Sequence, residues 1–469
     1  MKDSVVIDPK DNVCVCLARC GEIPAGHKRA LRFIAKGEYI IKYGYPIGRA
    51  TQDIKEGEWV HTHNLSSHLD GTERYRYSPV KALSSGGKEF YFSGYRNAYG
   101  RAGIRNDIYI IPTVGCVNGV CRTLEREAQQ FVGGSIDKII ALTHPFGCSQ
   151  LGRDGENIRK LLAAIALHPN AAYVLFVGLG CENNSLRGMQ EYLRPFTREN
   201  IAFYNCQDVE DEIGYGLSIL REFADAARHR RRECISSREL CIGLKCGGSD
   251  GFSGITANPL VGKISDRVVA AGGGAVLGEI PEMFGAEQIM LNKSKDEAVF
   301  EKFERMISDF KKGYIEQGFP VYENPSPGNR QGGITTLEEK SLGCIEKAGH
   351  GQVLDVLDYG ERVREAGGIT VLNTPGNDLI AATAIAAAGC QIVLFTTGRG
   401  TPFSTFVPTM KIASNDRLVD YKEKWIDFGA YGMDEERLFS LLVQTLNGEY
   451  HCKTEHLSEI AFYKTGVTL

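Results

Sequence analysis

The stretch DIYIIPTVGC, residues 107–116, is a short apolar run that ends in a proline, a glycine and a cysteine. A run of this length between turn residues indicates a buried strand. Similar runs follow at residues 138–142, 173–177 and 201–204, with helical stretches between them. Strands that alternate with helices in this way predict a largely parallel sheet with helices on its faces. This part of the chain is therefore expected to be α/β.

The same pattern returns further along the chain. Short apolar runs recur at residues 240–244, 275–277, 369–372 and 391–395, and residues 296–317 carry apolar side chains at helical spacing. A basic, polar helix is expected over residues 224–232, just before this second series begins. We therefore expect two α/β regions, residues 106–235 and 236–469.

The N-terminal part has a different pattern. Short β-like runs at residues 13–17 and 39–42 alternate with turns, which is typical of a small β-rich module, here residues 1–75. The polar residues that follow, with SSGG at 84–87, predict a linker over residues 76–105.

The composition of the 469 residues restricts the class of partner. Hydrophobic residues make up 43% and charged residues 24%, as in globular proteins. A net charge of −4 gives no electrostatic reason to expect nucleic acid or an anionic membrane, so a small ligand is expected. The apolar stretch 379–395 is interrupted by Gly389 and predicts a helix, a turn and a buried strand instead of a membrane span. The polar start shows no secretion or transit signal, so a cytoplasmic location is expected.

Cysteines recur in the loops that follow the predicted strands. Ligands of open α/β sheets collect at the carboxyl ends of strands, and four such loops contain a cysteine: residues 112–118, 143–150, 178–184 and 245–250. Thiolate and imidazole suit iron and other transition metals, although a cysteine near a sheet edge can also be a small buried apolar residue. The candidate metal ligands in these loops are Cys116, His144, Cys148 and Cys246. We expect plain burial for Cys14, Cys16, Cys20, Cys121, Cys206, Cys234, Cys241 and Cys452.

Three further histidines are candidates. His61 and His63 are two residues apart, so in an extended segment their side chains point to one face. They could bind one metal ion, and His63 could act as a catalytic acid or base; a solvated surface pair is the alternative. His350 lies between two glycines and is a further catalytic candidate.

Candidate substrate and base residues lie in other strand-end loops. Lys245 ends a strand beside a glycine-rich loop with Ser249 and Asp250, where backbone N–H groups can hold a carboxylate and a desolvated lysine can accept a proton. Arg399 is suited to a bidentate grip on a carboxylate, or else to a salt bridge that closes its loop, and Asn377 is a second clamp. The carboxylate pair Glu279 and Glu282 follows the strand at 275–277, a position that suits a divalent metal.

Several of these strings resemble one known family. Residues 24–28, 42–50 and 57–65 are similar to the SAF-type β-module of altronate dehydratases. Further strings resemble the body shared by altronate and galactarate dehydratases. They are residues 100–106, the loops of Cys116, Cys148 and Cys181, and residues 245–259, 279–282, 324–333, 342–350 and 396–409.

The resemblance implies an iron- or manganese-activated dehydratase of hexuronate catabolism that converts D-altronate into 2-keto-3-deoxy-D-gluconate. It also implies that the SAF-type module brings its histidine segment to the active site, and a homo-oligomer is possible. Four alternatives remain open: galactarate or another sugar acid as substrate, an iron–sulfur cluster on three strand-end thiols, and, from other classes, a non-catalytic sugar-acid sensor or an oxidoreductase. No G-x-G-x-x-G motif in a suitable position supports the oxidoreductase.

Overall fold

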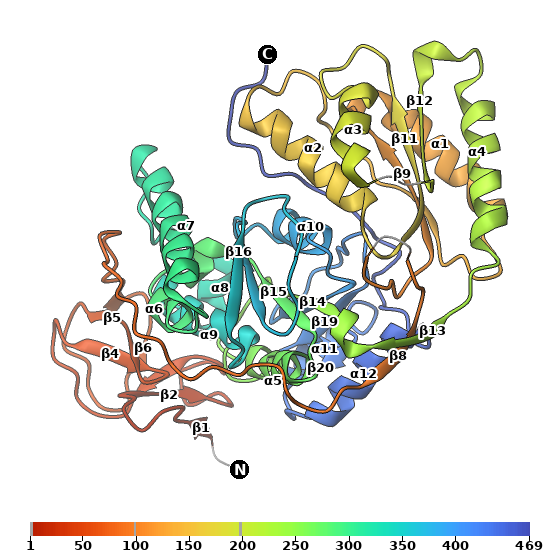
Figure 1. Cartoon of the computed structure of the whole chain (residues 1–469). Helices are drawn as coiled ribbons and strands as arrows, with labels where there is room; N and C mark the ends of the chain where they lie inside the picture. Colours follow the sequence, from red (N-terminus) through yellow and green to blue (C-terminus); the bar gives the residue numbers. More distant parts are fainter. Residues whose placement is uncertain (1–2, 98–99, 197–198) are drawn as a thin grey trace.

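The computed structural model describes residues 3–97, 100–196 and 199–469 (Figure 1). The N-terminal part is the small β-rich module that the sequence predicts. It contains two antiparallel sheets, with strand orders β1-β2-β3-β6 and β4-β5-β7. Their bounds are β1 (Ser4–Val5), β2 (Val13–Cys16), β3 (Lys28–Ala30), β4 (Tyr39–Lys42), β5 (Tyr45–Ala50), β6 (Trp59–Val60) and β7 (Leu65–Ser66).

The first α/β region contains the four predicted strands. They form one parallel sheet of order β10-β9-β11-β12. The strands are β9 (Asp107–Pro112), β10 (Ile139–Ala141), β11 (Ala171–Gly178) and β12 (Ile201–Asn205); the helices are α1 (Asn118–Ala128), α2 (Arg153–Ala166), α3 (Leu186–Leu193) and α4 (Glu212–Ala227). Alternate residues of β9 enter different cores: Ile108 packs with α1 and α4, and Tyr109 packs with α2 and α3. Helices therefore cover both faces, as the continuous apolar run predicts.

The helix expected over residues 224–232 is wrong in its extent. Helix α4 ends at Ala227, and residues 233–236 form strand β13 (Glu233–Ser236), which pairs with β8 (Tyr91–Gly94). The basic side chains find partners outside a helix, because Arg232 donates to the backbone carbonyls of Ser93 and Ile104. The proposed boundaries near residues 75, 105 and 235 stay predictions, and this pairing joins the expected linker to the chain just before residue 236.

The second α/β region is built on a seven-stranded parallel sheet of order β16-β17-β15-β14-β18-β19-β20. The strands are β14 (Cys241–Cys246), β15 (Gly274–Leu277), β16 (Val353–Leu357), β17 (Ile369–Leu372), β18 (Ile392–Thr397), β19 (Thr409–Ala413) and β20 (Phe428–Gly429). The helices are α5 (Ala257–Ala270), α6 (Glu287–Leu291), α7 (Glu297–Glu316), α8 (Pro327–Gln331), α9 (Leu337–Ile345), α10 (Asp378–Ala387), α11 (Asp416–Tyr421) and α12 (Glu435–Asn447). The chain proceeds from β14 to β15 on one side and returns to β18 on the other, so the strand order reverses at β14. Ligands of such sheets bind at the carboxyl ends of strands beside this reversal.

Two predictions for this region are confirmed. The stretch 379–395 forms α10, a turn and the buried strand β18, and residues 296–317 form α7 with Asp296 as its N-cap. In the residues that the structure describes, no helix is both long and apolar enough to cross a membrane.

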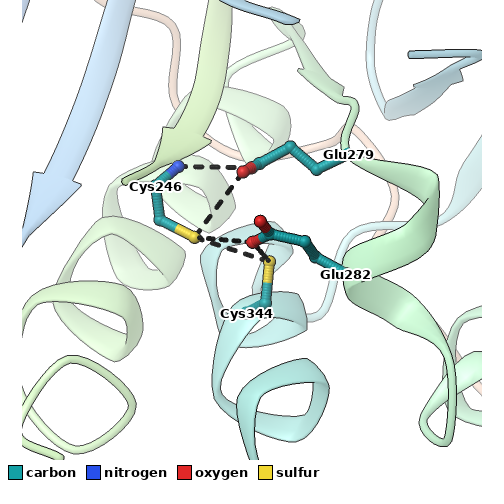
Figure 2. Close-up of side chains that lie close together, drawn as sticks. All are labelled: Cys246, Glu279, Glu282 and Cys344. Carbon is teal, nitrogen blue, oxygen red and sulfur yellow. Dashed lines mark hydrogen bonds between the residues drawn. The ribbon is translucent and has the colours of Figure 1, made fainter. Parts of the chain in front are cut away.

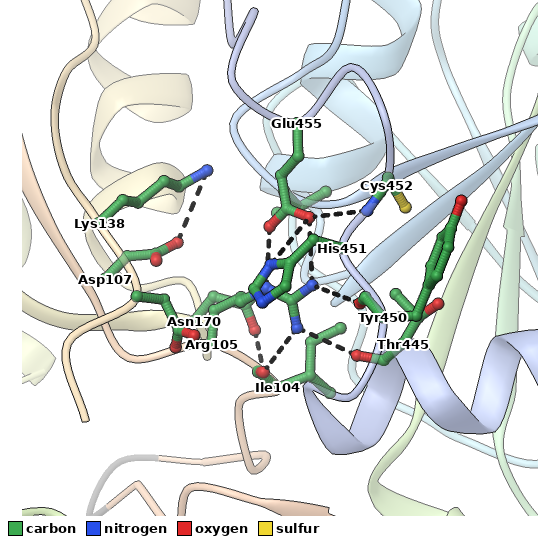
Figure 3. Close-up of polar contacts among 12 residues, drawn as sticks. Ile104, Arg105, Asp107, Lys138, Asn170, Thr445, Tyr450, His451, Cys452 and Glu455 are labelled. Atoms are coloured by element: carbon green, nitrogen blue, oxygen red, sulfur yellow. Dashed lines mark hydrogen bonds and ion pairs between the residues drawn. The ribbon is translucent and has the colours of Figure 1, made fainter. Parts of the chain in front are cut away.

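A buried ion pair joins the two α/β regions (Figure 3). Arg105, just before β9, is fully buried and donates from Nε and Nη2 to the carboxylate of Glu455 at 2.8 and 3.1 Å. Its Nη1 donates to the backbone carbonyls of Ile104 and Thr445. The chain after α12 therefore packs against the start of the first α/β region as well as against its own region.

Asp107, near this ion pair, should make stability depend on pH. Its carboxyl group is completely buried, and burial raises its pKa to about 7 against the opposing effect of the Lys138 ammonium 3.9 Å away. The folded chain therefore binds more protons than the unfolded chain between the ordinary carboxyl pKa and about 7, so stability falls as the pH rises through this window. Asp107→Asn removes this titration and should flatten the fall, measured by urea unfolding at about pH 5 and about pH 8. Asp225→Asn, which changes an exposed carboxylate of α4, is the control. An unchanged pH dependence in Asp107→Asn would contradict the assignment of the raised pKa to Asp107.

Candidate active site at the carboxyl ends of the central strands

Two cysteines and two glutamates meet beside β14 and β15 (Figure 2). Cys246 is the last residue of β14, Glu279 follows β15, Glu282 lies in the 3₁₀ turn Ile280–Met283, and Cys344 projects from α9. Each offers one ligand atom, and the four atoms lie within 4.8 Å of one another. All four residues are buried. We call these residues the Cys2Glu2 group.

Local backbone geometry directs these side chains inward. Glu279 has a φ of 64°, a left-handed conformation that costs a non-glycine residue roughly 1–2 kcal/mol. Thr374 holds it there, because its Oγ1 accepts the Glu279 N–H at 2.7 Å. The Glu279 carboxylate in turn accepts the N–H of Cys246 at 3.2 Å. Strained residues of this kind concentrate at functional sites, where the surrounding structure holds them in place.

The two thiols of the group share a hydrogen bond. Their Sγ atoms are 3.6 Å apart, and Cys246 Sγ is also 3.6 Å from Glu282 Oε2. The hydrogen bond from Cys344 lowers the pKa of Cys246, whereas donating it raises the pKa of Cys344 well above the ordinary value. Within the pair, the proton is therefore held less tightly at Cys246 than at Cys344.

A lysine from β14 completes the charge pattern. Lys245 is fully buried, and its Nζ lies 2.6 Å from Glu279 Oε1 and 2.8 Å from Asp378 Oδ1. Burial opposes its charge, but the carboxylates of Asp378 and Glu279 outweigh burial and raise the Lys245 pKa well above its usual range. Asp378 approaches closely because residue 247 is glycine: an added Cβ there would lie 2.3 Å from the Asp378 carboxylate. Lys245 is consequently held as an ammonium ion in this structure.

Two further lysines come from α9 and the turn after it. Lys340 Nζ lies 2.9 Å from Glu282 Oε1, and Lys347 Nζ lies 2.9 Å from Cys344 Sγ and 3.4 Å from Glu279 Oε2. With Lys245, three ammonium groups therefore face the carboxylates of Glu279, Glu282 and Asp378. The site is electrically balanced while both thiols keep their protons.

The N-terminal module covers this site through the same helix. Lys28 of β3 and Lys42 of β4 place their Nζ atoms 2.7 Å from the two carboxylate oxygens of Glu339, on α9. A cavity of about 10 Å³ remains between module and body, lined by residues that include Lys42, Cys246 and Asp250. This space holds about one water molecule, so a larger ligand enters only if the module moves.

The predicted substrate residues all lie at this end of the sheet. The Asp250 carboxylate accepts hydrogen bonds from Ser253, Ser414 and Asn415, so it fixes the loop after β14. The Ser249 carbonyl accepts from Asn329, and the Asn377 side chain caps α10. Arg399 is exposed and donates from Nη1 to the carbonyl of Gly328 at 3.2 Å. Its other guanidinium nitrogens can bind a carboxylate, so Arg399 is better placed for this than Ser249, Asp250 or Asn377.

The module's histidines lie next to α8. His61 Nε2 is 2.9 Å from the carbonyl oxygen of Arg330, and its ring stacks on His27 with centroids 5.2 Å apart. His63 is exposed and contacts the ring of Trp59 edge-on. Neither histidine belongs to the Cys2Glu2 group, and their assignment as metal ligands stays a prediction.

Three family models match the chain. They describe an altronate/galactarate dehydratase SAF domain at residues 19–68, a D-galactarate dehydratase/altronate hydrolase second domain at 94–228, and a D-galactarate/altronate dehydratase C-terminal domain at 237–468. An altronate dehydratase of Bacillus subtilis (strain 168) is 47% identical over 502 aligned residues and covers all of both chains.

The chain belongs to the galactarate/altronate dehydratase family. An altronate dehydratase of Escherichia coli (strain K12) is 46% identical, over 98% of this chain and 94% of its own. A galactarate dehydratase (L-threo-forming) of the same organism is 32% identical, over 86% of this chain and 80% of its own. The resemblance found in the sequence is thereby confirmed, and so is the prediction of a hydro-lyase.

Other predicted site residues of this dehydratase lie elsewhere. Cys116, His144 and Cys148 follow β9 and β10, at the carboxyl end of the other sheet. His144 is buried, its Nε2 is 2.8 Å from the carbonyl of Pro112, and burial lowers its pKa to about 4. The four loop ligands predicted as one set thus lie at two different sheets. Only Cys246 belongs to the Cys2Glu2 group.

His350 also lies apart from the Cys2Glu2 group. Its side chain is 86% exposed, and its Nδ1 pairs with Asp266 at 2.7 Å, whereas the Cys2Glu2 group is buried. The prediction missed Cys344, Lys340 and Lys347, because α9 does not follow a strand and strand ends guided the search. Their spacing of four and three residues, which places side chains on one helical face, was the available signal.

Proposed function

We propose that this enzyme dehydrates D-altronate to 2-keto-3-deoxy-D-gluconate, with a divalent metal ion in the Cys2Glu2 group. The full-length identity of 47% to an altronate dehydratase carries the substrate assignment, whereas the galactarate dehydratase is only 32% identical. Galactarate is therefore the second candidate. We place the reaction in cytoplasmic breakdown of hexuronates, the route that the resemblance implies.

The donor set of the Cys2Glu2 group fits a divalent ion. Its two thiols can release two protons on binding, which offsets two positive charges and keeps the balance with Lys245, Lys340 and Lys347. Sulfur and carboxylate oxygen together suit first-row transition ions, so we propose Fe²⁺, with Mn²⁺ as the alternative. When bound, such an ion would act as a Lewis acid toward the substrate carboxylate.

The chain's own residues supply the remaining electrostatics. Dehydration removes the proton from C2 and expels the C3 hydroxyl, which leaves with a proton as water; the enol then becomes the 2-keto acid. We assign Arg399 to the substrate carboxylate, because its exposed guanidinium can make paired hydrogen bonds. Lys245 was expected to accept the proton, but its raised pKa does not suit a base, so we assign its ammonium to the negative charge that develops at the carboxylate in the closed state. His63 is proposed to carry a proton to or from the site once the module moves.

A substrate panel tests this function. The enzyme is assayed for 2-keto acid formation from altronate, galactarate and other sugar acids, with ferrous ion, with manganese and after exhaustive chelation. We expect altronate with ferrous ion to give the highest rate and chelation to abolish it, because the weakly acidic C2 proton leaves only if the resulting charge is stabilised. Faster turnover of galactarate would overturn the substrate, and full activity without metal would overturn the metal.

A further inference from the structure

Three exposed cysteines lie at the carboxyl ends of three neighbouring strands in the first α/β region. Cys116 follows β9, Cys148 follows β10 and Cys181 follows β11, and β9 is the central strand of the three. The function proposed above does not use them. We call Cys116, Cys148 and Cys181 the thiol triad.

The loops that carry the triad are bonded to one another. The Gly115 N–H donates to the Phe146 carbonyl at 2.8 Å, which joins the first loop to the second. The Asn184 N–H donates to the Gly147 carbonyl at 3.0 Å, and its side-chain amide donates to the Thr113 carbonyl at 3.1 Å. Each loop thus contacts the other two, so the three cysteines lie in adjoining loops at the same end of this sheet.

Close backbone packing fixes this arrangement. Gly147 has a φ of 108°, and an added Cβ would lie 2.0 Å from the Thr113 carbonyl oxygen, so only glycine fits. An added Cβ at Gly115 would lie 3.0 Å from the His144 carbonyl oxygen. Each of these glycines directly precedes a triad cysteine. The loops are therefore packed backbone to backbone, with the thiols exposed.

The polar side chains near the triad are engaged in hydrogen bonds, so the thiols are the main groups free to bind a metal there. Glu182 is buried, and its carboxylate accepts from Thr113 Oγ1 at 2.5 Å and from the Gly180 N–H at 2.7 Å. The Cys148 thiol contacts Asn183 Oδ1 at 3.6 Å, and Gln207 Nε2 donates to Cys181 Sγ at 3.9 Å. The Ser149 hydroxyl also donates to Cys148 Sγ at 3.7 Å. Hydrogen bonds to sulfur tune the properties of iron–sulfur clusters.

The spacing of the triad favours a cluster over a single ion. Three thiolates on one tetrahedral ion, with metal–sulfur bonds of about 2.3 Å, stand roughly 3.8 Å apart. The three sulfur atoms of the triad do not all lie within 4.8 Å of one another, which is wider than a single tetrahedral ion requires. Among the described residues, the Cys2Glu2 group is the only one whose ligand atoms meet within 4.8 Å, and the triad is not part of it.

We propose that Cys116, Cys148 and Cys181 bind a four-iron, four-sulfide cluster through three of its irons. The fourth iron then has no protein thiolate and is open to a small oxygen ligand. A hollow of about 370 Å³ adjoins this place and is lined by residues that include Gln150, Arg159 and Asn183. Asn183 contacts the Cys148 thiol and Gly147 precedes it, so the hollow lies beside the Cys148 loop. This centre is separate from the Cys2Glu2 group and does not depend on the function proposed for that group.

Cluster assembly on the full chain tests the proposal. The protein is reconstituted anaerobically with ferrous ion and sulfide, and bound iron, acid-labile sulfide and visible absorbance are measured per chain. We expect about four sulfides in the wild type. Cys116→Ser, Cys148→Ser and Cys181→Ser should each lose most of the sulfide, because serine is a far less acidic ligand. The melting temperature of each variant checks that it is folded.

Two matched variants separate the triad from other thiols. Cys234→Ser changes a cysteine of β13 that is exposed, contrary to the burial expected from the sequence, and should retain the full sulfide content. Cys344→Ser changes the Cys2Glu2 group and should lower single-ion binding without loss of sulfide. A wild type that binds iron or zinc without sulfide would overturn the proposal, and so would triad variants that keep the cluster.

Discussion

Cys246→Ser and Glu282→Gln are each expected to lower altronate turnover and metal affinity by roughly a hundredfold or more. Serine is far less acidic than cysteine, so the first change removes an anionic ligand from the Cys2Glu2 group. The second change replaces a carboxylate by a neutral amide and also leaves the Lys340 ammonium, 2.9 Å away, without its charged partner. Both changes therefore upset the balance of charge that would let a divalent ion enter.

The measurement is bound metal per chain together with the initial rate and the melting temperature, so that loss of a ligand is separated from loss of the fold. Cys121→Ser is the matched control, because Cys121 is a fully buried cysteine on α1 outside both groups. It should keep normal metal content and lose at most modest stability. Normal metal and normal rate in both Cys246→Ser and Glu282→Gln would place the catalytic metal elsewhere.

The sequence predicted one half of this site well. Apolar runs ending in glycine mark β14 and β15, and the rule that ligands gather at strand ends therefore found Lys245, Cys246 and the two glutamates. The same rule could not tell to which sheet a strand end belongs. Cys116 and Cys148 were grouped with Cys246 for this reason, although the chain forms two separate parallel sheets.

Two strands of the second sheet, β19 and β16, were not predicted because charged residues interrupt their apolar runs. Strand β19 contains Lys411, which is fully buried and donates to Thr454 and to the carbonyl of Phe403. A lysine within a short run hides the pattern of a buried strand, since lysine is almost never fully buried unless it is paired. Strand β16 is also interrupted by a charged residue, the partly buried Asp355, which pairs with Lys302 of α7 at 3.2 Å. The sequence next to Lys411 and Asp355 does not show which groups pair with them.

Docking of the module was hidden for the same reason. The sequence pointed to His61 and His63, but the buried ion pairs between module and body come from Lys28 and Lys42. Their partner, Glu339, lies about 300 residues further along the chain, as its hydrogen bonds show. Only the tertiary structure brings these three charges together.

Removal of this partner should weaken docking of the module strongly. Burial opposes ionisation of Glu339, but the ammonium groups of Lys28 and Lys42 outweigh it and lower the Glu339 pKa well below its usual range. Its contribution to stability is therefore present at neutral pH and is lost as the pH falls through the lowered pKa. Burial lowers the pKa of Lys28 to about 8, so one carboxylate only partly offsets two buried ammonium groups.

Glu339→Gln leaves both ammonium groups without a counter-charge and should cost about 3–5 kcal/mol. Because the lysines belong to the module and Glu339 to α9, this loss should appear as faster proteolysis of the module and a lower urea midpoint. The same helix carries Lys340 and Cys344, so the Cys2Glu2 group should also bind metal less tightly. Lys42→Met in the Glu339→Gln chain removes one unpaired charge and should restore part of the stability.

The matched control is Glu38→Gln, which breaks the module's ion pair with Arg32. That pair is exposed, with side-chain exposures of 55% for Arg32 and 34% for Glu38, so its loss should cost less than about 1 kcal/mol. A Glu339→Gln protein no more sensitive to protease than Glu38→Gln would mean that apolar contacts, not the buried charges, hold the module on the body. In that case the cavity above Cys246 would stay closed without Glu339, and metal content should be unchanged.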